Sequence, residues 1–156
     1  GSITIPSKLG LGIAFGIPDK LTVTADLVMQ DWSTGSTAND FLEQDGFSLA
    51  NTRSMHFGIE YIPNHEALRG YHKLMSYRVG GYYSDHYIII KDYQMKDYGI
   101  TFGVGLPMNN SKSSFNVAFT MGTRGTTEYN LVKENYGIIT FSVTLHDLWF
   151  YKRKFD

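Results

Sequence analysis

Apolar and polar residues alternate along most of the chain, and this period of two predicts β-strands whose two faces differ. No segment has a helical repeat of three turns, although residues 65–72 could hold one short turn. The alternation predicts seven strands, over Lys8–Ile17, Leu21–Trp32, 55–61, 75–83, 98–106, 115–122 and 139–145.

The composition of the second face decides which face meets water. That face holds glycine, alanine, serine, threonine and asparagine, and its only charged residues are Asp26, Glu60 and Arg78. A solvated sheet face normally carries many lysines and glutamates, and glycines would weaken a soluble sheet. A membrane barrel turns its apolar face to lipid and its second face to a lumen. The sequence therefore favours an all-β, antiparallel, up-and-down transmembrane β-barrel.

The connections between the predicted strands alternate in length. The long connections cover Ser33–Arg53, Asp85–Lys96 and Arg124–Asn135. The connections between them are a tight turn around Pro18-Asp19, an intermediate segment over Pro63–His72 and a short one over Pro107–Lys112. Outer-membrane barrels have short periplasmic turns and longer outer loops, so this order predicts a periplasmic C-terminus. Seven strands do not close a typical bacterial barrel, which has an even number. We therefore expect residues 3–156 to be the C-terminal part of a larger barrel, unless an eighth strand lies in Asp147–Asp156 or Ile3–Ile5. Residues 1–2 are interpreted as a cloning scar.

Charge and composition exclude several classes of protein. The formal net charge of −1 argues against nucleic-acid binding through a basic face. The absence of cysteine excludes disulfides, thiolate zinc sites and cysteine nucleophiles. No stretch of about 18 apolar residues is present, so no transmembrane helix is predicted.

Glycine and aromatic motifs resemble those of one family of outer-membrane proteins. The motifs are Pro6-x-Lys8-x-Gly10-x-Gly12-x-Ala14-Phe15, Leu21-x-x-x-Ala25-Asp26, Asp31-Trp32-Ser33, Phe57-Gly58-Ile59-Glu60-Tyr61, Tyr77-Arg78-Val79-Gly80-Gly81-Tyr82-Tyr83 and Ile100-Thr101-Phe102-Gly103-Val104-Gly105. They resemble the C-terminal half of FadL-type transporters of long-chain fatty acids, and the ending Trp149–Asp156 is similar to Bacteroidetes members.

The resemblance implies passive transport of fatty-acid-like, hydrophobic small molecules across the bacterial outer membrane, without catalysis or a cofactor. Its expected partners are membrane lipid or detergent, a hydrophobic ligand of unknown binding residues and further copies joined through open strand edges. Two other functions stay open: a structural or assembly barrel that holds partner proteins, and a soluble ligand-binding β-barrel.

The candidate polar residues share the second face of the predicted sheet. Asp26, His56, Glu60 and Arg78 could form a polar network in the lumen, or they could be paired charges without a specific role. No catalytic residue is predicted, and the histidines lack the usual spacing of zinc ligands. An acidic loop, Asp40, Glu43 and Asp45, could bind calcium, although a solvated loop is the simpler interpretation.

Overall fold

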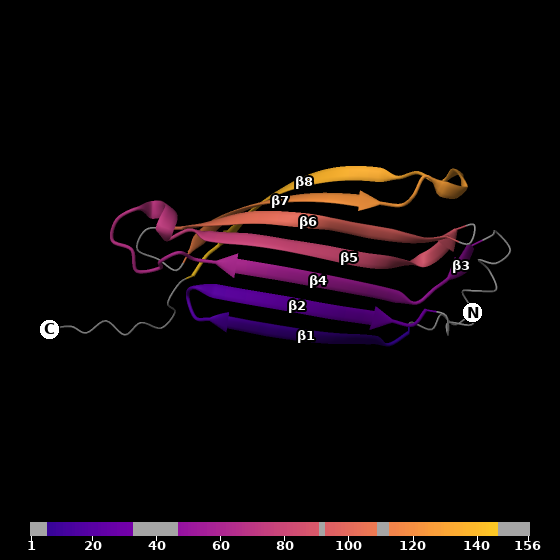
Figure 1. The fold of residues 1–156 in the computed structure, drawn as a ribbon, viewed down its shortest axis with the longest axis horizontal. Coiled ribbons are helices and arrows are strands. Elements are labelled where there is room, and N and C mark those ends of the chain that lie inside the picture. The colour runs from indigo at the N-terminus through magenta and orange to yellow at the C-terminus, as the bar shows by residue number, and fades with distance from the viewer. Residues whose placement is uncertain (1–5, 33–46, 91–92, 109–112, 147–156) are drawn as a thin grey trace.

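The chain folds into one antiparallel sheet in the computed structural model, which describes residues 6–32, 47–90, 93–108 and 113–146 (Figure 1). Seven strands follow one another in the order β1-β2-β4-β5-β6-β7-β8, and the short β3 pairs with β5 beside this path. The strands are β1 Lys8–Ile17, β2 Leu21–Gln30, β3 Phe47–Leu49, β4 Thr52–Tyr61, β5 Ser76–Ile90, β6 Tyr93–Pro107, β7 Ser114–Arg124 and β8 Glu134–Thr144. The predicted all-β, antiparallel, up-and-down class is confirmed. The sheet is open, because β1 and β8 each have one neighbour among the described strands.

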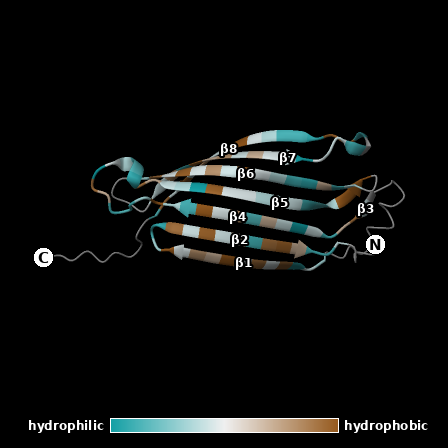
Figure 2. Cartoon of the chain, in the orientation of Figure 1, coloured by the Kyte–Doolittle hydropathy of each residue, from teal (hydrophilic) through white to brown (hydrophobic). Residues whose placement is uncertain are grey.

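The register gives the whole sheet two unlike faces. Ile13, Ala25, Phe57, Gly81, Ile100 and Met121 follow one another from β1 to β7 in one row. The next row toward β3 on the opposite face is Gly12, Asp26, His56, Tyr82, Gly99, Gly122 and Tyr136. Hydrophobic and hydrophilic residues alternate along the strands in Figure 2. We call these the apolar face and the polar face.

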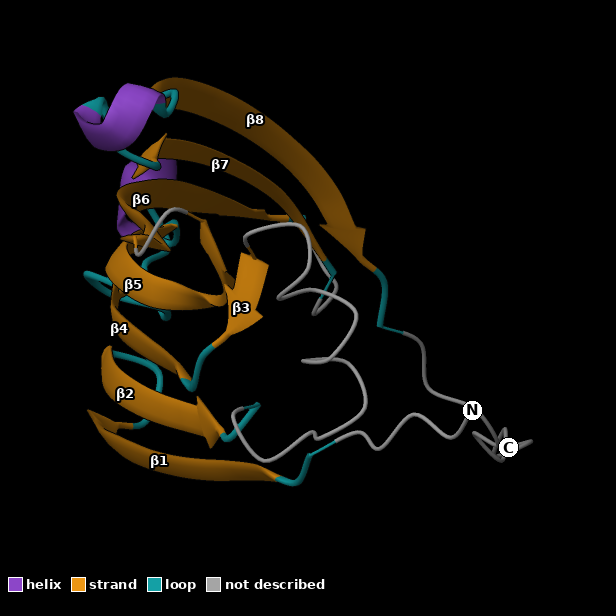
Figure 3. Cartoon of the chain, turned by 90° about the vertical axis from the view of Figure 1, so that its right-hand side faces the viewer, coloured by secondary structure: helices purple, strands orange, loops and turns teal. Residues whose placement is uncertain are grey.

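The sheet is strongly curved, as the view along it shows (Figure 3). On the polar face, the hydroxyl of Tyr82 on β5 reaches that of Tyr136 on β8. Side chains that stand on strands so far apart converge on the inside of a curved sheet and diverge on its outside. The polar face is therefore concave and the apolar face convex, and the glycines of the polar face make room for this curvature.

Burial in the sheet is the reverse of that in a soluble domain. Among the described residues no hydrophobic side chain is buried, and the buried residues are Ser76, Asp85, Asp97, Ser113 and two glycines, Gly105 and Gly122. The side chains of Ile13 and Phe15 on the convex face are 76% and 80% exposed. A soluble barrel would bury these residues in a core. The alternative of a soluble ligand-binding barrel disagrees with this distribution.

The predicted long connection over Asp85–Lys96 is wrong, because β5 and β6 continue through most of it as a hairpin extension. Asp85 pairs with Lys96, and the next pair is Ile89 with Gln94, so β5 contains a bulge between them. The bulge interrupts the alternation along β5, which is why the sequence pattern suggests a loop.

Other boundaries differ by smaller amounts. β2 ends before the predicted Trp32, and β4 and β8 begin earlier than predicted. The 3₁₀ helix η2 (Tyr71–Lys73) overlaps only the end of the short helical turn predicted over 65–72, and a second, η3 (Glu128–Asn130), precedes β8. No helix in the described residues is long and apolar enough to cross a membrane. The eighth strand suggested in Asp147–Asp156 or Ile3–Ile5 and the calcium loop lie outside the described residues.

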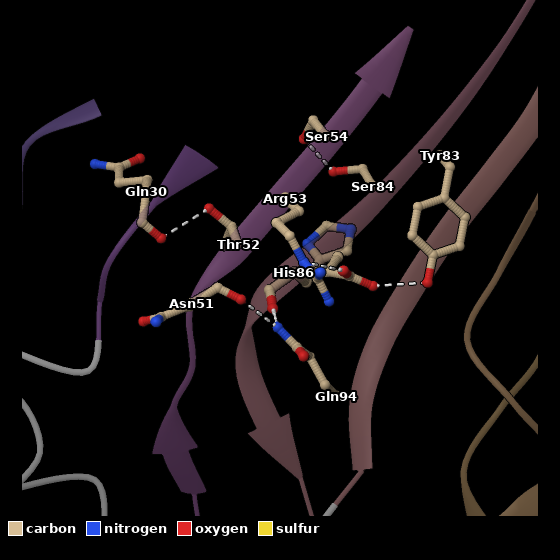
Figure 4. A network of polar contacts seen from close by, with 10 residues as sticks. Gln30, Asn51, Thr52, Arg53, Ser54, Tyr83, Ser84, His86 and Gln94 are labelled. Carbon is tan, nitrogen blue, oxygen red and sulfur yellow. Dashed lines mark hydrogen bonds and ion pairs between the residues drawn. The ribbon is translucent and has the colours of Figure 1, made fainter. Parts of the chain in front are cut away.

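Gln94 holds the bulge of β5 to the start of β4 (Figure 4). Its Nε2 donates hydrogen bonds of 2.8 Å to the carbonyl oxygens of His86 and Asn51. Close by, the backbone N–H of Ala50 donates to the carbonyl of Tyr87. One side-chain amide therefore links three segments at the end of the sheet where β3 lies.

Replacement of Gln94 tests this link. Gln94→Leu keeps the size of the side chain but leaves two carbonyls without their donor, which costs about 1 kcal/mol because water replaces part of the loss. We expect faster amide hydrogen exchange in residues 47–50 and 86–90, and unchanged exchange in β1 and β2. Unchanged exchange at the bulge would show that the backbone pairing of β3 holds this end without the side chain.

Candidate functional site: the polar concave face

Arg78 is the centre of a polar network that joins β4, β5, β7 and β8. Its Nε donates to Oε2 of Glu60 at 2.5 Å, and its Nη1 donates to Oδ1 of Asn116 at 2.9 Å. The Nδ2 of Asn116 donates in turn to the hydroxyls of Ser114 and Thr144, at 3.3 and 3.4 Å. We call these five residues the Arg78 network. An ion pair that is also hydrogen bonded is stronger than a neutral pair, so Arg78 ties β5 to β4 and β7, and Asn116 extends the network to β8.

Asp97 is the centre of a second network nearer the end with β3. Its Oδ2 accepts hydrogen bonds from Nε and Nη2 of Arg124, at 2.9 and 2.6 Å, and its Oδ1 accepts one from the hydroxyl of Tyr136 at 2.7 Å. The guanidinium of Arg124 also lies 5.7 Å from the centre of the Tyr136 ring, within cation–π range. Tyr82 completes what we call the Asp97 network, because its hydroxyl is hydrogen bonded to that of Tyr136.

The direction of the tyrosine hydrogen bonds follows from the donor count. A phenol has one hydrogen to donate, and a carboxylate only accepts. Tyr136 gives its hydrogen to Asp97, so Tyr82 must donate to the oxygen of Tyr136. The carboxylate of Asp97 is 9% exposed and has both oxygens occupied. The network is therefore satisfied in one arrangement.

Glycines lie beneath both networks. A Cβ on Gly122 would collide with the rings or hydroxyls of Tyr82 and Tyr136, and a Cβ on Gly105 would be 2.9 Å from Oδ1 of Asn116. Without these glycines the side chains could not cross from one strand to another close to the sheet. The many glycines of this face thus have a packing role, which is to let polar side chains bridge over a strand.

The four residues predicted as a lumen network lie on one face but do not form one network. Glu60 and Arg78 form an ion pair, as their position on adjacent strands allows. Asp26 and His56 are neighbours in the register of β2 and β4. The ring of His56 stacks with that of Tyr82, with 6.4 Å between centroids. No described residue forms a hydrogen bond or ion pair with the side chain of Asp26.

Sequence reasoning missed the Asp97 network and the part that Asn116 has in the Arg78 network. Asp97 precedes the predicted fifth strand, and Tyr136 precedes the predicted seventh, so the predicted strands place neither residue on a face. A usable signal was present, because continuing the alternation backwards puts Asp97 and Tyr136 on the polar face with Gly99 and Ile138. Within the described part of the chain, no group of three or more histidine, cysteine, aspartate or glutamate residues could hold a metal ion.

Comparison with known proteins gives one family. The whole chain, residues 1–156, matches the family described as BamG. No curated protein and no solved structure matches the chain significantly. The resemblance to FadL-type transporters is therefore wrong as a family assignment, since the family that matches over the full length is a different one. Alternating glycines and aromatics are common to outer-membrane barrels, which explains why the motifs pointed to the wrong family.

The functional predictions that depended on that resemblance are corrected with it. Passive transport of hydrophobic molecules is wrong, and so is the assignment to lipid transport. The predicted partners do not match this family either, because the family implies partnership with outer-membrane assembly proteins and not with a hydrophobic ligand. The alternative of a structural or assembly role fits the family better than transport does. The predicted association with the bacterial outer membrane agrees with the family.

Proposed function

The chain belongs to the BamG family, and we propose from this membership that it works as a structural component of the β-barrel assembly machinery of the bacterial outer membrane. Its partners would be the other proteins of that machinery. The role includes no catalytic step and no cofactor. The described residues would form part of the wall of a transmembrane barrel, which is completed by strands outside residues 3–156.

The reversed burial of the sheet supports the transmembrane part of this proposal. Monomeric soluble proteins rarely expose a large continuous apolar surface, and one on this scale indicates contact with a membrane or another protein. The convex stripe of β1 runs from Leu9 to Ile17, eight residue steps or about 26 Å along the strand. This is of the same order as the apolar band of an outer-membrane barrel, about 25 Å.

Tyrosines on the convex face also mark the borders that a membrane would require. Tyr61 and Tyr77 are register partners toward one end of the strands, and Tyr83 and Tyr98 are partners toward the other. Girdles of aromatic residues flank the apolar band of outer-membrane barrels at both interfaces. Beyond Tyr83, the same face becomes charged.

The charged cluster beyond this border consists of Arg53, Asp85 and Lys96. Nε of Arg53 lies 3.9 Å from Oδ2 of Asp85, which is also the register partner of Lys96. The hydroxyl of Tyr83 donates to Oδ1 of Asp85 at 2.9 Å. Charged groups gather where a strand leaves the bilayer, so this cluster supports an aqueous boundary at the end with β3.

We propose that this end faces the cell exterior and that the C-terminus is periplasmic. The connection between β2 and β4 and the extension of the β5–β6 hairpin both lie at this end, and outer-membrane barrels carry their longer loops outside. A cysteine at Asn51 should react with a membrane-impermeant maleimide on intact cells, and a cysteine at Asp19 should not. The reverse labelling would contradict the orientation.

Purification from the native membrane tests the assembly role. The complete protein, tagged on the chromosome and extracted in mild detergent, should co-purify with the barrel and accessory subunits of the assembly machinery. Its depletion should lower the folded fraction of several unrelated outer-membrane proteins, measured by their heat-dependent mobility in SDS gels. Normal outer-membrane proteins after depletion, without co-purified subunits, would refute the role.

A further inference from the structure

Asp26 is the one charged side chain inside a strand of the polar face that lacks an opposite charge among the described residues. Glu60 and Arg78 form one ion pair, and Asp97 and Arg124 form another. The remaining charged residues of this face begin their strands: Lys8 and Glu134. Asp26, by contrast, lies in the middle of β2. The other charged side chains inside the strands of this face are paired with opposite charges, so an opposite charge is also expected for Asp26.

The carboxylate of Asp26 lies over Gly12 on β1. An atom at the Cβ position of Gly12 would collide with Oδ1 of Asp26, so the side chain extends across the neighbouring strand close to its backbone. β1 pairs only with β2 in the described sheet. The carboxylate is thus directed toward the open edge of the sheet.

The same arrangement occurs twice elsewhere on this face with both side chains present. Arg78 on β5 reaches Asn116 on β7 across the glycines of β6, and Tyr82 on β5 reaches Tyr136 on β8 across Gly99 and Gly122. In each case, polar side chains from strands that are not adjacent meet above glycine. At Gly12 one side chain is in place, and its counterpart would have to come from beyond β1.

The edge of β1 has the properties of a strand that is paired. All ten of its residues are in register with β2, and none is a proline. Its only charged residue is Lys8, at its first position. Free edges are normally protected by charges, prolines or bulges, and β1 has none of these after Lys8. In lipid, its backbone groups would need partners.

We propose that a strand of the same barrel lies antiparallel to β1 and carries a lysine or arginine whose cationic group crosses Gly12 and pairs with Asp26. This inference depends on the proposed barrel. The residue would stand opposite Gly12, or two positions along the strand, as Asn116 does relative to Arg78. The sheet follows chain order with antiparallel neighbours throughout, which favours the same barrel over a separate protein as the source.

Whether replacement of Asp26 lowers the unfolding temperature tests for a cationic partner of this carboxylate. Asp26→Asn, in the complete protein purified alone in detergent, should lower the temperature of heat-induced unfolding by about 3–8 °C, because the cation is left without its partner. Glu60→Gln is the matched control, since its partner Arg78 is known. An unchanged or higher unfolding temperature for Asp26→Asn would overturn the proposal, because removal of an unpaired carboxylate costs nothing.

A charge exchange identifies the partner. Asp26→Lys should prevent stable folding, and a second change of one lysine or arginine to aspartate in the strand beside β1 should restore at least half of the lost unfolding temperature. If no such change restores it, or if Asp26→Asn has its effect only when other proteins are bound, the proposal is wrong. The isolated protein is used throughout, so a failure of the assembly role would not alter these results.

Discussion

Phe102→Lys is expected to destabilise the membrane-inserted protein by about 2–4 kcal/mol, the cost of a cation on the lipid-facing side of a barrel near the bilayer centre. Phe102 lies in the middle of β6 on the convex face, between Val79 and Phe119 in register, and is 49% exposed. In the proposed barrel its ring contacts lipid, so a lysine there must extend toward an interface or enter the hydrocarbon.

The adjacent residue supplies the matched control. Thr101 precedes Phe102 and points to the concave face, in register with Gly80 and Thr120. Thr101→Lys puts the same charge at the same depth but inside the barrel, where the lumen is polar. We expect a change within about 1 kcal/mol, since a substitution in the lumen escapes most of the lipid penalty.

Reversible unfolding of the complete protein in phospholipid vesicles measures both variants. A large loss for Phe102→Lys with a small one for Thr101→Lys would assign the convex face to lipid. Equal, small effects would mean that the convex face meets water, because a lysine on a solvated sheet face is well tolerated. A large loss for Thr101→Lys alone would reverse the assignment of the two faces.

The parts of the fold that depend on the sequence of a single strand or turn could be predicted. β1 begins and ends at the predicted residues, Lys8 and Ile17, because alternation alone defines a strand with unlike faces. The hairpin between β1 and β2 could be predicted equally well. Its turn contains Pro18, and Asp19 adopts a positive φ of 54°, which aspartate tolerates better than most residues.

Features that depend on two strands at once were not predictable. The bulge of β5 is a relation between Asp85 and Ile89 on one strand and Lys96 and Gln94 on the other, and neither sequence alone contains it. β3 was hidden for the same reason, because its pairing with Ile88–Ile90 exists only once β5 continues past the bulge. The three consecutive isoleucines show no alternation of apolar and polar residues from which a strand could be predicted.

The polar networks illustrate the same limit. The alternation of apolar and polar residues correctly placed Glu60 and Arg78 on the same face of the sheet. Their ion pair, however, depends on the register of β4 and β5. Asp97 and Tyr136 are 39 residues apart and meet because three strands align. The family could not be derived from the residues either, because alternating glycines and aromatics indicate only a sheet with two unlike faces, which unrelated families share.

Asp97→Ala is expected to lower the free energy of unfolding by about 2 kcal/mol, a value below the usual cost of breaking a buried ion pair because solvent reaches one partner. The carboxylate is 9% exposed and accepts three hydrogen bonds, two from Arg124 and one from Tyr136. Its removal leaves a guanidinium and a phenol without acceptors. The Arg124 side chain is 43% exposed, so water recovers part of the loss.

Graded variants separate charge from hydrogen bonding in this network. Asp97→Asn keeps one acceptor oxygen and loses the charge, so its effect should lie between wild type and Asp97→Ala. Arg124→Ala combined with Asp97→Ala should be less destabilising than the sum of the single changes, because the cation that lost its partner is removed. Glu128→Ala, at an exposed residue of η3, controls for loss of negative charge and should change stability by less than about 0.5 kcal/mol. Chemical denaturation in detergent measures these four variants and Arg124→Ala alone. If Asp97→Ala is no worse than Glu128→Ala, backbone pairing alone holds β6, β7 and β8 together, and the Asp97 network only fills the concave side.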